Sequence, residues 1–469
     1  MKFIGLLFVS FFLIGSAYSQ NINPYLNRKI IDKNAKYVWQ FSALANSSFS
    51  SNQQNSNYQN KFLPDNLSKN YNNRNSNIGI DGQAYIKAGY QIKEQNMVGL
   101  SAKFEINYNS NLRHQNPQLD QLFIYQENLW GKFEFGNYVA VNQRMKYGPS
   151  KFAVSAGGIN GKYLELVNLA MLKNNNPLCS DDANVISCKN LRNPQFILLP
   201  QSPIGHGGYA KSFYGRDVDN NFNGKNIKSF NKYNYRSIKD DSFEGLEDAL
   251  KFNYYSPRIN DVQLGISYTP DSSLNGFTAK SAYDSNDVRL KNIVSMGANY
   301  FRDFDNIKLA LSSTFEYGQN SSQHGAQRRN LKAFDLGWSM SYFGFTVGSS
   351  YGNWGKSLTA KNGIYSIASN KANAKYQTWG LAYQIGGVKT SLTSLTSNFY
   401  GNKYAALSFG LDYKIKKNLL SYIEITNFKF NSASSNIFSN PQQIMVANSS
   451  DYVQNNRGKV LITGIYYIF

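Results

Sequence analysis

Stretches of about ten residues in which apolar and polar side chains alternate recur along the chain from Tyr37 onward. A period of two places successive side chains on opposite faces of a β-strand, and helical spacing fits none of these stretches. Within residues 79–93, for example, Ile86 and Ala88 fall on one face and Lys87 falls on the other. Because the polar faces carry charge, they must contact water. The pattern therefore predicts strands with one apolar face and one hydrated face.

Sixteen segments with this pattern can be drawn, and the connections between them alternate in length. The segments are residues 36–49, 78–93, 97–109, 119–127, 130–140, 248–256, 260–269, 292–302, 306–318, 332–342, 344–353, 375–384, 387–395, 403–414, 418–430 and 459–469. Connections after even-numbered segments are short turns, whereas those after odd-numbered segments are mostly longer. An even strand number with this asymmetry is typical of bacterial outer-membrane barrels, whereas a soluble β-sandwich does not require it. We expect an all-β, transmembrane antiparallel β-barrel of 16 strands.

The N-terminus has the features of a secretory signal peptide. Lys2 precedes an apolar run over residues 3–14, and Ala17 and Ser19 supply the small residues that signal peptidase reads. A buried N-terminal helix is the alternative. No later window reaches the ~18 consecutive apolar residues of a membrane helix, so an exported chain could cross a bilayer only as a closed barrel. The sequence predicts a signal peptide at residues 1–19, one barrel domain at 20–469, and the cell outer membrane as its location.

Charge and composition narrow the possible partners of the chain. The formal net charge of +20 suits nucleic acid, anionic lipid or anionic solutes, although AT-rich coding would also enrich Lys, Asn, Tyr, Ile and Phe. No folded basic module can be drawn and the chain is exported, so no nucleic-acid partner is expected. With only 2 cysteines and 11 prolines, disulfide scaffolds, collagen-like folds and zinc clusters are excluded.

The longest connection, residues 141–246, lies between the fifth and sixth predicted strands. A loop of this length in a compact fold needs a function, and the lumen of a sixteen-stranded barrel can hold part of it. We expect residues 142–172 to fold inward and narrow the channel as a long third external loop. Cys179 and Cys188 lie in the same insertion, where an oxidising compartment favours a disulfide between them; two free thiols are the alternative.

A constriction selects by charge when charged groups face each other within about one Debye length, ~8 Å at physiological salt. Alternation places several charged residues on the inward faces, and Lys outnumbers the acids among them. The candidates are Lys87, Lys103, Lys132, Glu105 and Glu134 on the wall, and Lys146, Lys151 and Glu165 on the insertion. We expect a water-filled pore with a weak preference for anions.

Catalytic motifs are missing from the sequence. His114, His206 and His324 all fall in predicted loops, without a second His at helical spacing and without a H-E-x-x-H motif. A barrel-embedded hydrolase would need a His on a strand end, and no predicted strand carries one. We therefore expect no catalytic residues, no metal site and no cofactor.

Three segments resemble Gram-negative general diffusion porins, in particular the proteobacterial branch of these trimeric, sixteen-stranded proteins. Residues 251–271, KFNYYSPRINDVQLGISYTPD, are similar to the family's sixth and seventh strands. Residues 135–144 resemble the entry to its constriction loop. Tyr467 and Phe469 at the C-terminus are similar to the aromatic signal that the barrel-assembly machinery recognises.

The resemblance implies a homotrimer in outer-membrane lipids that passes small hydrophilic solutes by passive diffusion. It further implies an inward-folded third external loop and a basic ladder opposite loop carboxylates, which maps to Lys87, Lys103 and Lys132 facing Glu165. Two other functions stay open. One is a substrate-specific outer-membrane channel, and the other is a surface adhesin or receptor barrel with antigenic loops.

Overall fold

The structure is a computed structural model that describes only part of the chain. The described residues are 37–54, 76–93, 96–109, 118–153, 249–272, 290–321, 329–357, 373–399, 402–416, 418–431 and 455–468. The predicted signal peptide, Glu165, the Cys179–Cys188 pair and Phe469 lie outside these residues.

Sixteen strands account for nearly all of the described secondary structure. They are β1 (Tyr37–Gln54), β2 (Ser76–Lys93), β3 (Asn96–Asn109), β4 (Gln118–Asn128), β5 (Gly131–Asn137), β6 (Leu250–Tyr255), β7 (Val262–Asp271), β8 (Leu290–Phe304), β9 (Ile307–Asn320), β10 (Leu331–Tyr342), β11 (Phe345–Gly355), β12 (Ala374–Ile385), β13 (Val388–Phe399), β14 (Asn402–Lys416), β15 (Leu419–Asn431) and β16 (Asn455–Ile468). Two short helical elements follow β5, namely α2 (Val141–Arg144) and the 3-10 turn η2 (Pro149–Lys151).

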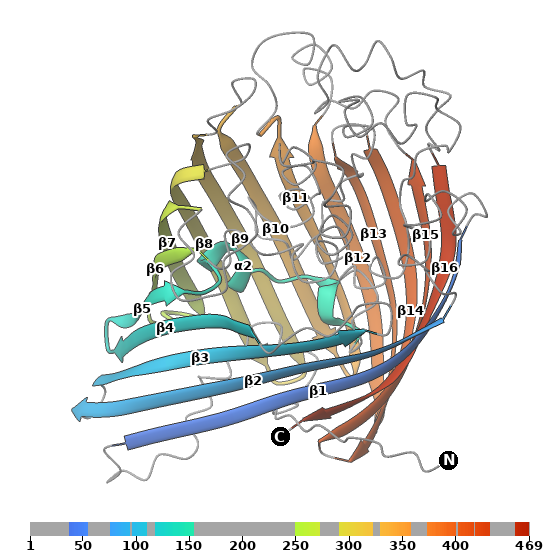
Figure 1. Cartoon of the computed structure of the whole chain (residues 1–469), viewed down its shortest axis with the longest axis horizontal. Coiled ribbons are helices and arrows are strands. Elements are labelled where there is room, and N and C mark those ends of the chain that lie inside the picture. The colour runs from blue at the N-terminus through green and yellow to red at the C-terminus, as the bar shows by residue number, and fades with distance from the viewer. Residues whose placement is uncertain are drawn as a thin grey trace, which may run out of the picture.

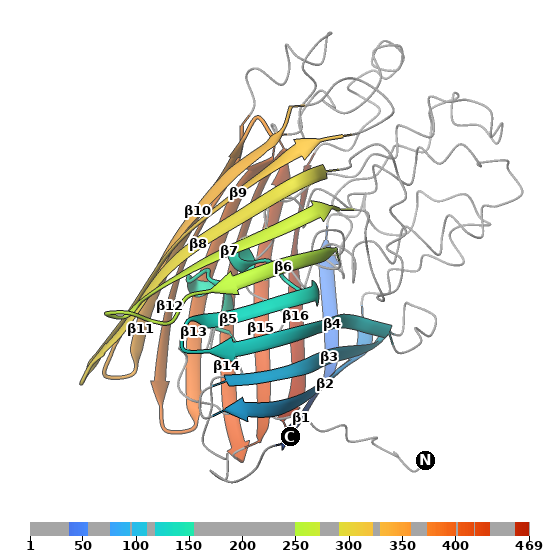
Figure 2. The same cartoon turned by 90° about the vertical axis from the view of Figure 1, so that its left-hand side faces the viewer.

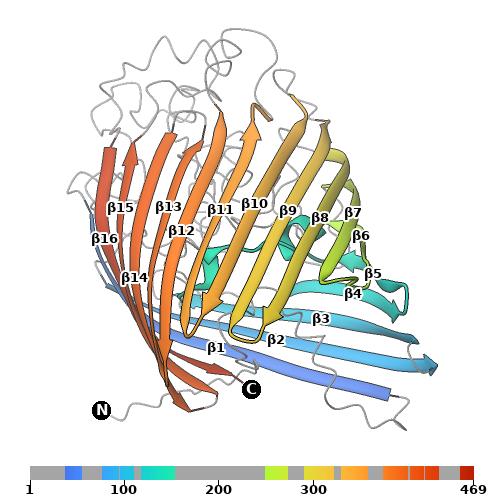
Figure 3. The same cartoon turned by 180° about the vertical axis from the view of Figure 1, so that it is seen from behind.

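The strands form one closed antiparallel ring in which each strand pairs with its neighbours in the chain (Figure 1). The ring closes where β1 pairs with β16, in a register that runs from Leu44 opposite Ile468 to Gln54 opposite Gly458. Figure 3 shows the wall formed by β8 to β16 from behind, with α2 inside the ring. The predicted antiparallel barrel of sixteen strands is therefore confirmed.

The two faces of the wall differ as the alternation predicts. On β10, Leu336 and Trp338 point outward with 49% and 39% of their surface exposed, whereas Asp335 before them and Ser339 after them are buried. A soluble sandwich would show the reverse, with its apolar face buried. Exposed apolar side chains on the outside and polar ones within suit a barrel with hydrocarbon around it and water inside.

The connections also follow the predicted asymmetry, with one exception. Turns of a few residues join β4 to β5, β10 to β11 and β12 to β13, whereas residues 55–75 and 432–454 form long connections after β1 and β15. The exception is the connection from β13 to β14, which consists of residues 400–401 only.

The barrel wall is built from its shortest strands at β5 and β6, which have 7 and 6 residues, and is therefore lowest there (Figure 2). The sequence predicts a strand over residues 130–140, but β5 ends at Asn137. Gly136 there has a φ of 144°, and beyond it the chain leaves the sheet. Within the described part of the chain, no helix is both long and apolar enough to cross a membrane.

Candidate functional site

The chain that follows β5 lies against the inner wall of the barrel. We call residues 138–153 the inward segment. Its side chains, and the backbone of Tyr147, lie against inward-facing wall positions that are glycines. The neighbours of these glycines on the same strands point outward. The contacts are Met145 at Gly265 and Gly297, Tyr147 at Gly337, Pro149 at Gly380, Phe152 at Gly348 and Gly380, and Ala153 at Gly410. The inward segment therefore crosses the wall from β7 to β14, and α2 contacts β6 to β9.

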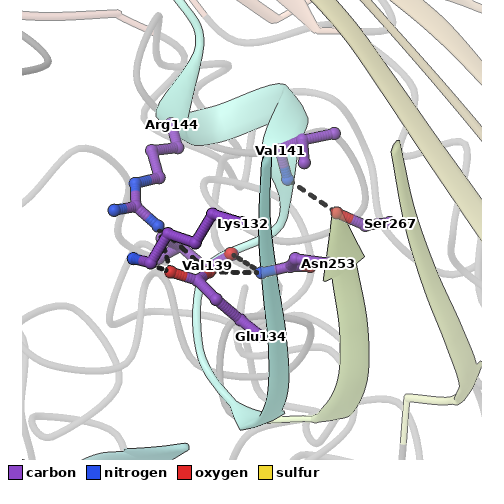
Figure 4. A network of polar contacts seen from close by, with 7 residues as sticks. All are labelled: Lys132, Glu134, Val139, Val141, Arg144, Asn253 and Ser267. Atoms are coloured by element: carbon purple, nitrogen blue, oxygen red, sulfur yellow. Dashed lines mark hydrogen bonds and ion pairs between the residues drawn. The ribbon is translucent and has the colours of Figure 1, made fainter. Parts of the chain in front are cut away.

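Hydrogen bonds from wall side chains hold the inward segment in place. The Val141 amide donates to Ser267 Oγ at 2.8 Å, and Asn253 Nδ2 donates to the carbonyl oxygen of Val139 at 3.0 Å (Figure 4). The Tyr147 amide donates to Ser312 Oγ, also at 2.8 Å. The first contact satisfies an amide at the start of α2, and the other two pair backbone groups of the inward segment before and after that helix.

Glu134 of β5 is the centre of a charged network beneath α2 (Figure 4). Arg144 Nη1 donates to both of its carboxylate oxygens, at 2.8 and 3.0 Å, and Lys132 Nζ donates to Oε1. Asn253 Nδ2 adds a contact at 3.3 Å to Oε2. Glu134 is only 2% exposed, so each of these contacts acts where water screens little.

Arg144 connects this network to two tyrosine rings. Its guanidinium carbon lies 5.0 Å from the ring centre of Tyr138 and 4.9 Å from that of Tyr255. Burial lowers the pKa of Arg144, but the Glu134 carboxylate and the two tyrosines outweigh burial and raise that pKa well above its ordinary value. Arg144 is therefore positively charged at every pH at which the protein folds.

The three lysines predicted for the wall all lie on its inward face. Lys87 Nζ is 4.4 Å from the ring centre of Tyr125, and Lys132 Nζ is 5.6 Å from the same ring. Lys103 Nζ is 5.9 Å from the ring of Tyr85. Lys87 and Lys132 thus share one aromatic neighbour, which brings two cations close to Glu134 and Arg144.

A second set of charges lies on the far side of the ring and includes carboxylates that the sequence analysis did not select. Lys146 Nζ is 3.7 Å from Asp335 Oδ2, an oxygen that also accepts from the hydroxyl of Tyr376. The others are Glu316, which accepts from Ser295 Oγ at 2.8 Å, Asp412, which pairs with Lys389 at 3.0 Å, and Glu424, which is 1% exposed.

The structure brings together some of the predicted site residues and does not place others. Lys87, Lys132 and Glu134 belong to one cluster, and Lys146 lies at the second. For Glu105 and Lys151 the structure gives only the strand β3 and the turn η2. Tyr467 lies on β16 opposite Ala45 of β1. Arg144 was not selected from the sequence, although it lies only 10 residues from its partner Glu134.

Among the residues that the structure places, no group of three His, Cys, Asp or Glu side chains could hold a metal ion. The inner wall is a surface of fixed charges and hydroxyl groups. Such a surface can attract, orient and screen dissolved ions, which is the chemistry of a pore lining.

Comparisons with known proteins give a family match and a set of relatives. The family model described as Gram-negative porin matches residues 204–433. An uncharacterized protein of Rickettsia bellii is 26% identical over 348 residues, which is 65% of this chain and 69% of that protein. An uncharacterized protein of Rickettsia typhi is 30% identical over 240 residues, and the match covers 42% of this chain and 54% of that relative's length.

Solved structures with a similar fold include two porins. An anion-selective porin from Comamonas acidovorans has a TM-score of 0.48 and 10% identity, with 92% of this chain and 100% of that chain covered. A mutant of the Rhodopseudomonas blastica porin has a TM-score of 0.43 and 11% identity, with 91% and 100% covered.

The family model that matches describes porins, which are channel proteins. The matched residues carry β6 to β15 of the barrel and include the hairpin that the sequence analysis compared with porins. The predicted resemblance to Gram-negative porins is therefore confirmed by the family match over residues 204–433, within a closed barrel of sixteen strands.

Proposed function

We propose that the protein is an outer-membrane channel for passive diffusion of small hydrophilic solutes and ions, with a weak preference for anions. The observation that carries this proposal is the closed barrel with outward apolar and inward polar side chains. A packed barrel would need apolar side chains throughout its interior, whereas charges and hydroxyl groups favour water there. No catalytic step is part of this function.

The preference for anions rests on the cluster around Glu134. Three cations, Lys87, Lys132 and Arg144, lie close enough to interact with Glu134, and Glu127 is the other carboxylate near Lys87. Three positive and two negative charges leave a net charge of +1. Four carboxylates, on β9, β10, β14 and β15, act against this excess, and four further inward-facing lysines, Lys103, Lys146, Lys251 and Lys389, offset them, so the preference is weak.

The constriction itself is part of the proposal. The inward segment occupies space inside the ring along the wall from β7 to β14, and it brings Arg144 and Lys146 into the lumen. This supports a third external loop that narrows the pore. Glu165 as an opposing carboxylate, the Cys179–Cys188 disulfide and the signal peptide of residues 1–19 remain predictions.

The low wall at β5 and β6 supports association of copies into a homotrimer. A transmembrane strand needs about 9 to 11 residues, more than either strand has. Phe135 and Phe252 are nevertheless about half exposed on the outer face. Both line a groove of about 680 Å³, together with Trp39 and Leu100. A neighbouring copy would cover this apolar side where the wall is too low to span the bilayer alone.

Bilayer lipids cover the remaining outer face, and the aromatic C-terminus would serve the barrel-assembly machinery.

Planar-bilayer recording of the purified full-length protein tests the channel. We expect discrete conductance steps. In a KCl gradient, we expect a reversal potential whose sign shows that anions permeate more readily than cations. Protein that inserts into the bilayer without any steps would contradict a channel and would favour a plugged surface barrel. Clear steps with a reversal potential on the cation side would retain the channel and refute the preference for anions.

A further inference from the structure

Tyr147 occupies a tightly fitted position on the inner wall, between α2 and η2. Its amide donates to Ser312 Oγ of β9 at 2.8 Å, and Ser312 Oγ is in turn 3.4 Å from the carbonyl oxygen of Gly337 on β10. A Cβ atom on Gly337 would overlap the carbonyl oxygen of Tyr147. The backbone of Tyr147 can therefore lie against the wall only because residue 337 has no side chain.

The turn between β6 and β7 lies close to the hydroxyl end of the Tyr147 side chain. Arg258 from this turn lies near the Tyr147 hydroxyl and interacts with it electrostatically. Burial raises the pKa of Tyr147, and Arg258 offsets only part of this effect, so the phenol stays neutral. Arg258 is itself fixed, because it donates to Asn299 Oδ1 at 2.8 Å and to the carbonyl oxygen of Asp261 at 2.6 Å.

The contact at Gly337 differs in kind from the other glycine contacts of the inward segment. Gly265 and Gly297 face the thioether of Met145, and a flexible side chain of this kind can move aside. Gly337 faces a backbone carbonyl whose residue is fixed through its amide. An added methyl group there has to displace the segment itself.

We propose that Gly337 and Ser312 form a seat for Tyr147 that sets how far the inward segment stands off the wall, and thereby sets the open width of the pore. Both are positioning residues, because they act on permeation through the inward segment. This inference rests on the channel function proposed above and identifies the wall residues that determine its width.

The test compares Gly337→Ala with the matched variant Gly318→Ala. Gly318 also lies on the inner wall, on β9, but an added Cβ would meet only side-chain atoms of Ile293 at 3.1 Å and Leu290 at 3.7 Å. Both variants add one methyl group to an inward-facing strand position. Only Gly337→Ala touches the inward segment, so the difference between the two variants isolates the seat.

Two measurements on the full chain are needed. Hydrogen–deuterium exchange reports whether the Tyr147 amide, which donates to Ser312 in the wild type, has become accessible to solvent in the variant. Single-channel conductance reports the open width. In Gly337→Ala we expect exchange of the peptide around Tyr147 at least ~10-fold faster. We also expect conductance lower by about a third or more, because the displaced segment moves toward the pore axis. Gly318→Ala should match the wild type in both.

The possible outcomes separate this inference from the channel proposal. If the wild type conducts and Gly337→Ala changes neither exchange nor conductance, the seat is refuted. If exchange rises while conductance stays at the wild-type value, the claim that the seat sets pore width is refuted. If the wild type itself shows no conductance while exchange responds as expected, the channel function fails and the seat alone is supported.

Discussion

Replacing Glu134 with Gln tests whether the charge cluster beneath α2 sets ion preference. The amide keeps the shape of the side chain and removes one negative charge, so the local net charge rises from +1 to +2 by the count given above. Lys132 and Arg144 lose their charged partner but keep an oxygen that can accept a hydrogen bond. The substitution should therefore strengthen the preference for anions.

The size of this effect follows from the distance at which ions pass the cluster. A unit charge about 6 Å away in water interacts with about 0.7 kcal/mol, and screening at physiological salt reduces this to about 0.3 kcal/mol. The change favours anions and disfavours cations by the same amount, which together is about 0.6 kcal/mol. This corresponds to a rise of roughly 3-fold in the anion-to-cation permeability ratio.

Reversal potentials in a KCl gradient give this ratio directly. The control is Asp305→Asn in the turn between β8 and β9, where φ is 54°, a conformation that Asn tolerates well. It removes the same charge with the same isosteric change, outside the lumen, and should leave the ratio unchanged. An equal shift in both variants, or a shift of Glu134→Gln toward cations, would refute the reasoning.

Three further predictions concern the wall and its charges. Leu336→Arg on the outer face should reduce membrane insertion at a cost of about 2 to 4 kcal/mol, which folding assays in lipid vesicles would show. Ser339→Arg on the inner face should insert normally and lower the conductance, which bilayer recording would show. Arg144→Lys keeps the positive charge but loses the contact of one guanidinium nitrogen with both oxygens of Glu134. The variant should have a lower thermal transition temperature and the same sign of ion preference, and a reversed sign would contradict this prediction. Raising the salt concentration to 1 M shortens the Debye length to about 3 Å and should bring the reversal potential close to zero, whereas a salt-independent preference would point to pore size instead of charge.

The sequence was sufficient for the barrel because each strand carries its own signal. Alternation identified all sixteen strands and placed Lys87, Lys103 and Lys132 on the inner face. The same rule places Asp335 inward, since Phe334 and Leu336 on either side of it point outward. Alternation alone therefore predicts the direction of the Asp335 side chain, but it does not predict that the inward segment brings Lys146 to it.

The route of the inward segment could not be predicted in the same way. Its position depends on contacts between residues far apart in sequence, such as Tyr147 with Gly337 and Phe152 with Gly380. These contacts require the register of many strands to be known together. The pair of Glu134 and Arg144 was also missed, because the predicted strand continued to residue 140 and so kept the chain in the sheet beyond Asn137.

The pairing of β1 with β16 has a consequence for the order in which this protein can be made. Of the described strands, β1 is synthesised first and β16 last, so one edge of β1 has no partner until β16 has been translated. An unpaired edge with an apolar face invites aggregation. The barrel therefore cannot close before β16 is available, and until then the free edge of β1 needs protection from other chains.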